Sequence, residues 1–229
     1  MVKPLFDSIL NYHMDITVKQ MMQIEENSHQ MGFKRNFMME NAGAAVARFL
    51  SEKFLDISSK KILVFAGLGN NGGDALVVAR HLAGFDSDVR VILLGSSDKI
   101  KTEEARINWA ILEKMNSIDL LISSDVSGLD LKADVVVDGI LGTGISGKIR
   151  EPYASAIDMI NKLMAFKIAI DIPSGLDPDT GNTSDKCVRA DVTITFHKMK
   201  VGIPKRKDVC GTILVEKIGI PTEAEVGVL

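Results

Sequence analysis

Residues 61–74 read KILVFAGLGNNGGD, and this stretch decides the fold. Its first six residues are mostly large and apolar, which predicts a buried β-strand. A turn with four glycines follows directly, and the residues after it predict a helix at about 73–83. A strand, a glycine-rich turn and a helix in this order indicate the first unit of a doubly wound parallel sheet.

Two later stretches repeat this pattern. The predicted strand 133–138 runs into a glycine-rich turn that ends at Gly147, and the strand 167–171 runs into Ile172-Pro173-Ser174-Gly175. The other predicted elements are helices at about 17–30, 36–54, 102–115 and 153–164, and strands at 89–94, 191–196 and 212–216. This alternation predicts a Rossmann-like three-layer αβα sandwich with a mostly parallel central sheet, as one domain over residues 1–229. A short basic loop joins the last two strands, which leaves antiparallel pairing open for them.

The composition supports this fold class and excludes several kinds of partner. Hydrophobic residues make up 46% of the 229 residues but aromatic residues only 5%, so the core is aliphatic, as in a buried parallel sheet. A net charge of −3 argues against binding along a nucleic-acid backbone. No apolar run approaches the ~20 residues that span a membrane, and no signal peptide is evident. Cys187 and Cys210 lack a CxxC spacing and suggest a reducing compartment. We therefore expect a soluble cytoplasmic protein with neither a nucleic-acid nor a membrane partner.

The three turns predict a nucleotide-sized site. The carboxyl ends of parallel strands meet at one sheet edge, where ligands bind, and glycine lets the backbone approach a phosphate. Gly67–Gly72 and Gly142–Gly147 both match G-x-G-x-x-G. A dinucleotide-binding dehydrogenase also needs an acidic residue at the end of the second strand, where this chain has Leu94-Gly95-Ser96. An ordinary NAD dehydrogenase is therefore disfavoured, and a P-loop is excluded because no G-K-[ST] follows either turn.

Polar side chains stand in all three turns. The carboxylates of Asp138 and Asp171, the Ser174 hydroxyl and an Asn amide would form an oxygen-rich cluster of the kind that hard cations prefer, and no Cys or His lies in these turns to favour zinc. Plainer interpretations stay open: Asp138 caps its turn, and Asp74 is a first-turn acid that the helix dipole favours. Glu40 and Asn41, in a predicted helix rich in small residues, either lie in close packing or face the site.

Five motifs in order carry a family resemblance. They are Met39-Glu40-Asn41-Ala42-Gly43, Asn70-Asn71-Gly72-Gly73-Asp74, Asp138 with the turn Gly142–Gly147, Asp171-Ile172-Pro173-Ser174-Gly175-Leu176-Asp177, and Thr195–Gly202. Together they resemble the NAD(P)H-hydrate epimerases, the YjeF N-terminal domain family, over residues 15–218. The resemblance implies an isomerase that interconverts the R and S forms of hydrated NADH and NADPH (NADHX and NADPHX), whose reduced nicotinamide ring carries a hydroxyl on C6.

The resemblance also implies a set of site residues. One potassium ion per subunit is expected on Asn71, Asp138 and Ser174. Substrate is expected on Asn70, Asn71, Gly72, Gly73, Asp74, Gly142, Thr143, Gly144, Ile145, Ser146, Gly147, Lys148 and Asp171. We expect a homodimer. In this family the domain is often fused to a dehydratase that repairs the S form. This sequence shows no dehydratase domain, so we expect a separate dehydratase to use the S form.

The chemistry needs a group that gives and takes a proton on the C6 oxygen, because the centre is a carbinolamine that loses hydroxide or opens its ring. Asp171, at the end of its strand, is the expected catalytic residue, whereas Asp138 is expected to stay ionised beside the cation. The turn 142–147, with Lys148, is expected to hold the pyrophosphate. His197 is a candidate to line the site, and the basic run 198–207 is either a solvated loop or a contact for the adenosine phosphates.

Two other classes of protein remain to be weighed. The same domain family serves as a scaffold in mRNA decapping and as a secreted lipoprotein-binding partner, so a nucleotide-binding protein without turnover is the main alternative. The presence of Asn71, Asp138, Asp171 and Ser174 favours the enzyme. A ribokinase-like phosphotransferase is disfavoured because nothing resembles its ATP site.

Overall fold

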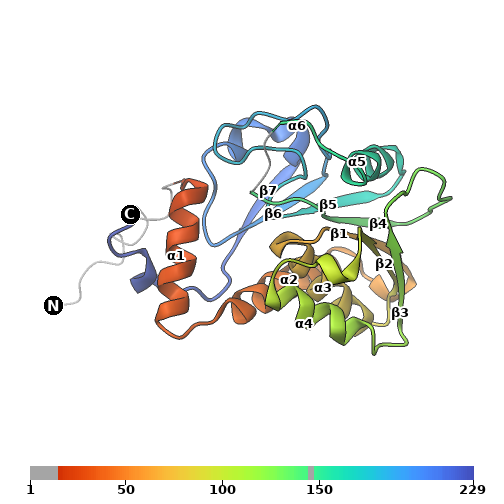
Figure 1. Ribbon diagram of the computed structural model, residues 1–229, viewed down its shortest axis with the longest axis horizontal. Coiled ribbons are helices and arrows are strands. Elements are labelled where there is room, and N and C mark those ends of the chain that lie inside the picture. Colours follow the sequence, from red (N-terminus) through yellow and green to blue (C-terminus); the bar gives the residue numbers. More distant parts are fainter. Residues whose placement is uncertain (1–14, 144–146) are drawn as a thin grey trace.

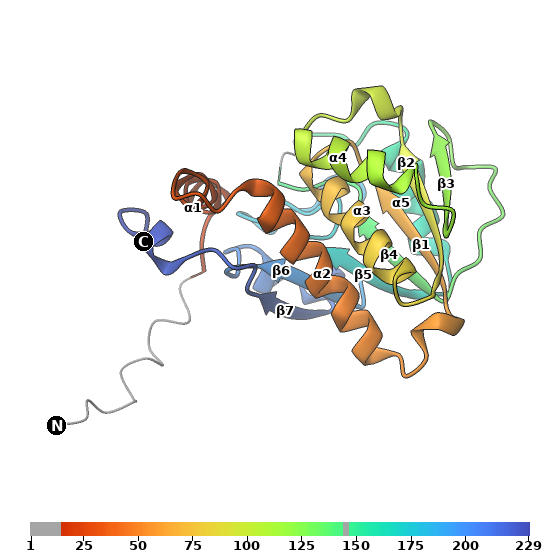
Figure 2. The same cartoon turned by 90° about the horizontal axis from the view of Figure 1, so that it is seen from below.

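The computed structural model describes residues 15–143 and 147–229 and contains a seven-stranded sheet in the order β3-β2-β1-β4-β5-β6-β7, parallel throughout. The strands are β1 (Lys61–Ala66), β2 (Asp88–Leu94), β3 (Ile118–Ser123), β4 (Val135–Gly139), β5 (Phe166–Ile170), β6 (Val192–Phe196) and β7 (Thr212–Glu216). The helices are α1 (Val18–Gln30), α2 (Arg35–Lys53), α3 (Asn70–Ala83), α4 (Glu103–Leu112), α5 (Tyr153–Lys162) and α6 (Lys207–Cys210). Helices cover both faces of the sheet, so the predicted three-layer fold is confirmed (Figures 1 and 2).

Alternation along the strands divides the core in two. In β1, Ile62 and Val64 pack toward α2, α3 and α4, whereas Leu63 and Phe65 pack on the opposite face toward α5. Successive side chains of a strand point to opposite faces, so a strand that is apolar at every position has to be covered on both sides. The aliphatic composition therefore matches a sheet that helices cover on both faces.

Two details differ from the sequence predictions. Strand β3 was not predicted; it lies at the sheet edge, is only partly buried and carries Asp119 as its second residue, so its apolar signal is weak. Strands β6 and β7 pair parallel, with Val192 opposite Thr212. Parallel pairing needs a connection of about a dozen residues or more. Residues 197–211, including the short helix α6, provide it.

Helices α2 and α3 pack closely through Gly43. A Cβ on this residue would lie 2.5 Å from the Cβ of Val77, so close packing explains the small residues of α2. The Glu40 side chain pairs with Arg80 and His81 of α3, and the Asn41 amide donates to the Ile218 carbonyl (2.8 Å). Neither side chain lines the cavity described below, so the alternative that they face the site is wrong.

Helix α1 lies at the carboxyl edge of the sheet, apart from the two helical layers (Figure 1). It begins with a capping box in which the Gln20 backbone N–H donates to the Thr17 hydroxyl and the Thr17 N–H donates to the Gln20 side chain. Just before it, Ile16 forms a parallel bridge with Lys200. In the described ranges, no helix is both long and apolar enough to span a bilayer.

Candidate active site

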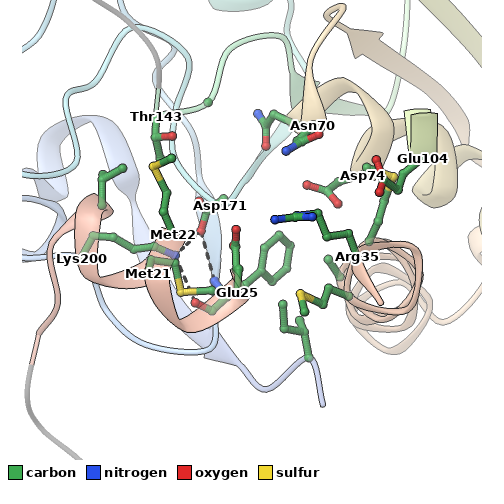
Figure 3. A pocket seen from close by; sticks show the side chains of 18 residues that line it. Met21, Met22, Glu25, Arg35, Asn70, Asp74, Glu104, Thr143, Asp171 and Lys200 are labelled. Carbon is green, nitrogen blue, oxygen red and sulfur yellow. Dashed lines mark hydrogen bonds and ion pairs between the residues drawn. The ribbon is translucent and has the colours of Figure 1, made fainter. Parts of the chain in front are cut away.

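A cavity of about 310 Å³ opens at the carboxyl edge of the sheet (Figure 3). Its walls come from helices α1–α4, the end of β5, the turn after β4, and the end of β6 with the segment that follows it. Its charged side chains are Glu25, Arg35, Asp74, Glu104, Asp171 and Lys200, and they are joined by Asn70, Asn71, Gly142 and Thr143. The predicted meeting of glycine turns at one sheet edge therefore coincides with a real cavity.

Asp171 is held rigidly at the end of β5. Its backbone has a φ of +60°, a left-handed conformation that is uncommon for residues other than glycine. The Oδ1 atom accepts hydrogen bonds from Lys200 Nζ (2.5 Å), Thr195 Oγ1 (2.9 Å) and the Phe196 backbone N–H (3.2 Å). Among the described residues, all hydrogen bonds to this carboxylate reach Oδ1. The second oxygen is thereby left for a ligand.

Lys200 is a site residue that sequence reasoning missed. Its side chain is 1% exposed, and Nζ also donates to Thr195 Oγ1 (3.0 Å) and to the Phe196 carbonyl (3.1 Å). The interpretation of the run 198–207 as a solvated loop is therefore wrong at this residue. Elsewhere in the run, Lys198 pairs with Glu225 and Arg206 with Asp208. The motif Thr195–Gly202 could have pointed to Lys200, because this lysine lies within it.

Three further carboxyl groups share the cavity, those of Glu25, Asp74 and Glu104. Asp74 lies in the second turn of α3, because the helix begins at Asn70 and has no acidic residue in its first turn; the helix-dipole interpretation of this residue is wrong. Burial raises the pKa of Asp74 well above its ordinary value, and the nearby charges of Asp171 and Glu25 raise it further. Burial, followed by Asp171, also raises the pKa of Glu25, against the opposing effects of Lys200 and Arg35.

Asp138, Ser174 and Asn71 are brought together behind the cavity. Asp138 accepts from the Ser174 hydroxyl (2.6 Å), the Ser174 N–H (2.8 Å) and the Ile140 N–H (3.2 Å), so it does cap its turn. The Ser174 hydroxyl in turn accepts from the Leu141 N–H (2.9 Å), and the Asn71 side-chain amide donates to the Leu141 carbonyl (3.1 Å). One network thus joins the three turns.

The oxygen atoms of Asn71, Asp138 and Ser174 are the part of this network that could hold a cation. Asp138 is 1% exposed, and burial raises its pKa to about 6 despite the hydrogen bonds from Ser174 and Ile140. Among the described residues, the Asp138 carboxylate is bonded by the Ser174 hydroxyl and by backbone N–H groups, and no basic side chain offsets its charge. Because the Asn71 Nδ2 faces the Leu141 carbonyl, the amide oxygen points away from that carbonyl. The donor set is oxygen only, as hard cations prefer.

The glycines of the first turn serve packing. A Cβ on Gly67 would lie 1.8 Å from the Ile140 carbonyl oxygen, and one on Gly72 would lie 1.9 Å from the Gly67 oxygen. Gly73 faces Met39 in the same way, with 2.5 Å to its methyl group. These contacts seat the first turn against the turn after β4. Gly72 and Gly73 are therefore buried supports that do not themselves line the cavity.

The remaining predicted residues divide by position. Asn70, Asn71, Asp74, Gly142, Thr143 and Asp171 line the cavity, whereas Gly147 and Lys148 are exposed and do not line it. Gly144, Ile145 and Ser146 lie outside the described residues. His197 is buried away from the cavity, with Nε2 3.0 Å from Glu225 Oε1. Burial, helped by Lys217, lowers the pKa of His197 to about 4, so the idea that this histidine lines the site is wrong.

Sequence reasoning also missed Glu25 and Arg35, because both come from helices that lie far from the glycine turns along the chain. The Arg35 guanidinium pairs with Glu26 and extends into the cavity between Glu25 and Asp74 in Figure 3. Only the folded chain shows that α1 and α2 form the outer wall.

Comparisons with known proteins agree with this geometry. The family described as YjeF-related protein N-terminus matches residues 35–202. The chain is 59% identical to the NAD(P)H-hydrate epimerase of Nitrosopumilus maritimus and 62% identical to that of Cenarchaeum symbiosum, over 94% of this chain and all of each relative. It is 44% identical to the bifunctional NAD(P)H-hydrate repair enzyme Nnr of Archaeoglobus fulgidus, of which it covers 42%. The crystal structure of yeast ynu0, YNL200c, superposes with a TM-score of 0.79 at 26% identity, over 93% of this chain and 92% of the yeast chain.

Proposed function

This chain belongs to the family of YjeF-related protein N-termini, and we propose that it is an NAD(P)H-hydrate epimerase, an isomerase that interconverts the R and S forms of NADHX and NADPHX. The observation that carries the proposal is the Asp171 carboxylate, which lines a cavity of about 310 Å³ and is held through one oxygen by buried Lys200. The full-length relatives at 59% and 62% identity support the substrate.

The reaction needs proton transfer at the C6 hydroxyl. The ring nitrogen N1 can expel the hydroxyl as water once the oxygen is protonated, or the ring can open, and both routes need a general acid or base in contact with that oxygen. Asp171 is the proposed group, because its Oδ1 is occupied by donors while Oδ2 is left for the substrate. Lys200 keeps the carboxylate in one orientation, which makes it a positioning residue.

The rest of the dinucleotide is proposed to run along the sheet edge. The hydrated nicotinamide fits the cavity beside Asn70, Asp74 and Asp171, and the pyrophosphate follows the turn that starts at Gly142 and Thr143. The predicted contacts of Gly144, Ile145, Ser146, Gly147 and Lys148 belong to this part of the proposal. Exposed Lys148 offers a positive charge at its outer end.

A potassium ion on Asn71, Asp138 and Ser174 is a further part of the proposal. The buried Asp138 carboxylate, with its raised pKa, supports it, because a bound cation would compensate that charge. When bound, the ion supplies positive charge near the phosphate turn. Asn71 and Ser174 both bond to the Leu141 backbone and so join the three turns. We therefore expect ion binding to stiffen the site.

The biological setting is proposed from the relatives and the composition. The bifunctional repair enzymes carry a matching region within a chain more than twice as long, which supports a dehydratase as the functional partner here. The free thiols Cys187 and Cys210 suit the reducing cytoplasm. We retain the homodimer as part of the proposal. The alternative, a scaffold without turnover, has no use for a carboxylate fixed by a buried lysine.

The test is epimer exchange on the purified protein. NADPHX enriched in the R form should relax to the equilibrium mixture at a rate proportional to enzyme concentration, as followed by proton NMR or chromatography. Crystals soaked in rubidium or thallium should show an anomalous peak between Asn71, Asp138 and Ser174. Failure of exchange at high enzyme concentration would support the scaffold alternative, and an ordered site with no peak would count against the ion.

A further inference from the structure

Epimerisation poses a problem that one carboxylate does not solve by itself. If the hydroxyl leaves C6 from one face of the ring and oxygen returns to the other, the acid that protonates the leaving oxygen and the base that accepts a proton from the incoming water act on different faces. Asp171 serves one face only, since its backbone and Oδ1 are fixed to β6 and Lys200. The second group has to come from another wall of the cavity.

Helix α1 forms such a wall. It lies outside the sheet edge and precedes the region that the family match covers, residues 35–202. Its start is attached firmly: the Ile16 N–H donates to the Met199 carbonyl (2.8 Å), the Val201 N–H donates to the Ile16 carbonyl (3.1 Å), and the Val18 N–H donates to Asp179 Oδ1 (2.7 Å). The helix is therefore fixed to the same segment that carries Lys200.

Glu25 is the acidic side chain that α1 turns toward the cavity. It follows Met21 by four residues and so shares the inner side of the helix, where Met21 and Ile24 are buried. In Figure 3 its carboxyl group points into the cavity near Asp171 and Arg35. Within the described ranges, the Glu25 carboxyl has no hydrogen-bond or ion-pair partner, so no structural bond accounts for it.

Burial, with the nearby charge of Asp171, favours the protonated form of Glu25. Asp171 at the end of β5 supplies negative charge, which Lys200 and Arg35 oppose; Asp74 of α3, whose own pKa is raised, and Glu104 of α4 line the same cavity. Burial and Asp171 together raise the pKa of Glu25. The next residue behaves oppositely: Glu26 bonds to Gln30 and Arg35, which lower its pKa. A raised pKa lets a carboxyl group keep its proton to higher pH, as a general acid requires.

We propose that Glu25 is a second catalytic residue, the proton-exchanging partner of Asp171, an inference that rests on the proposed function. In one direction the Glu25 O–H bond breaks, its proton passes to the C6 oxygen, the C6–O bond breaks and water leaves, while the N1 electron pair forms a C6=N1 iminium. Water then attacks the other face: a new C6–O bond forms, the π electrons return to N1, and the extra proton of the water passes to Asp171. The reverse reaction exchanges the two roles, and no oxidant or reductant is needed.

The test combines three variants in potassium-containing buffer. Glu25→Gln keeps the size of the side chain and removes its proton exchange, Glu25→Asp keeps the exchange on a shorter side chain, and Glu52→Gln makes the same chemical change at an exposed position of α2. We expect Glu25→Gln to lower kcat by about 100-fold or more with KM changed less than about three-fold, since general acid–base catalysis contributes ~10²–10⁴-fold. Glu25→Asp should recover part of the rate, and Glu52→Gln should match the wild type.

Two readouts separate proton transfer from a structural role. The pH profile of kcat should lose one of its two limbs in Glu25→Gln, and wild-type epimerisation in ¹⁸O-enriched water should place ¹⁸O on C6. The inference would be overturned if Glu25→Gln exchanged epimers at the wild-type rate, changed only in KM or kept the wild-type pH profile. Epimerisation by the wild type without ¹⁸O uptake would also overturn it. If the wild type itself shows no exchange, the proposed function fails first, so the two failures are distinguishable.

Discussion

Replacing Asp171 with Asn tests the catalytic assignment and the role of the buried ion pair together. The amide keeps the shape of the side chain and one oxygen that can accept from Thr195 and Phe196, but it removes the charge opposite Lys200. Lys200 is 1% exposed and would then be a buried cation without its counter-ion. Asn also cannot exchange a proton at the C6 oxygen.

The structure sets the expected magnitudes. Removing one partner of a buried pair destabilises by about 3–5 kcal/mol. The Asp171 side chain is 18% exposed and Glu25 lies nearby, so we expect the lower end, about 3 kcal/mol. For a domain of this size that corresponds to a fall in Tm of roughly 6–12 °C. Activity should fall by about 10²–10⁴-fold, since general acid–base catalysis is lost.

A double variant separates the two effects. Asp171→Asn combined with Lys200→Met removes both charges and should recover most of the lost stability, because no unpaired charge remains, while activity stays low. Thermal melting and epimer exchange measured on the same samples give both quantities. An Asp171→Asn protein that exchanges epimers at the wild-type rate would refute the acid–base assignment. One that melts like the wild type would refute the argument about the buried pair.

Three further predictions follow from other parts of the site. Burial raises the pKa of Asp138 from 3.8 to about 6, so its contribution of about 3 kcal/mol to the free energy of unfolding is present below pH 3.8 and lost as pH rises through 6. Denaturant titrations in potassium-free buffer, with Asp138→Asn as the reference, should show this loss of stability, and added potassium should reduce the loss. Gly72→Ala should destabilise by several kcal/mol, because its Cβ would lie 1.9 Å from the Gly67 oxygen, whereas Gly69→Ala, with nothing within 4 Å, should melt within about 2 °C of the wild type. Lys148→Ala should raise KM for NADPHX by about three- to ten-fold with kcat unchanged, as steady-state kinetics at two salt concentrations would show, and an unchanged KM would remove Lys148 from the phosphate site.

The sequence was most informative where local chemistry alone decides structure. Strands β1 and β5 are apolar at all but one position and β4 begins with three valines, so their existence and burial follow from composition and length. Their glycine turns follow too; at Gly67, for example, a Cβ would collide with the Ile140 carbonyl oxygen. The start of α3 was placed three residues late, since glycines at 72 and 73 disfavour a helix and only the packed turn stabilises one there.

By itself, then, the sequence determined the layered fold and the edge at which its turns meet. Tertiary structure decided what meets there. Asp171 and Lys200 become partners only because β6 lies beside β5 and the chain after it turns back. Glu25 enters the cavity only because Ile16 pairs with Lys200 and brings α1 across the sheet edge. Local propensity is a property of neighbouring residues, whereas burial, charge pairing and a raised pKa arise between side chains that the fold brings together from distant parts of the chain.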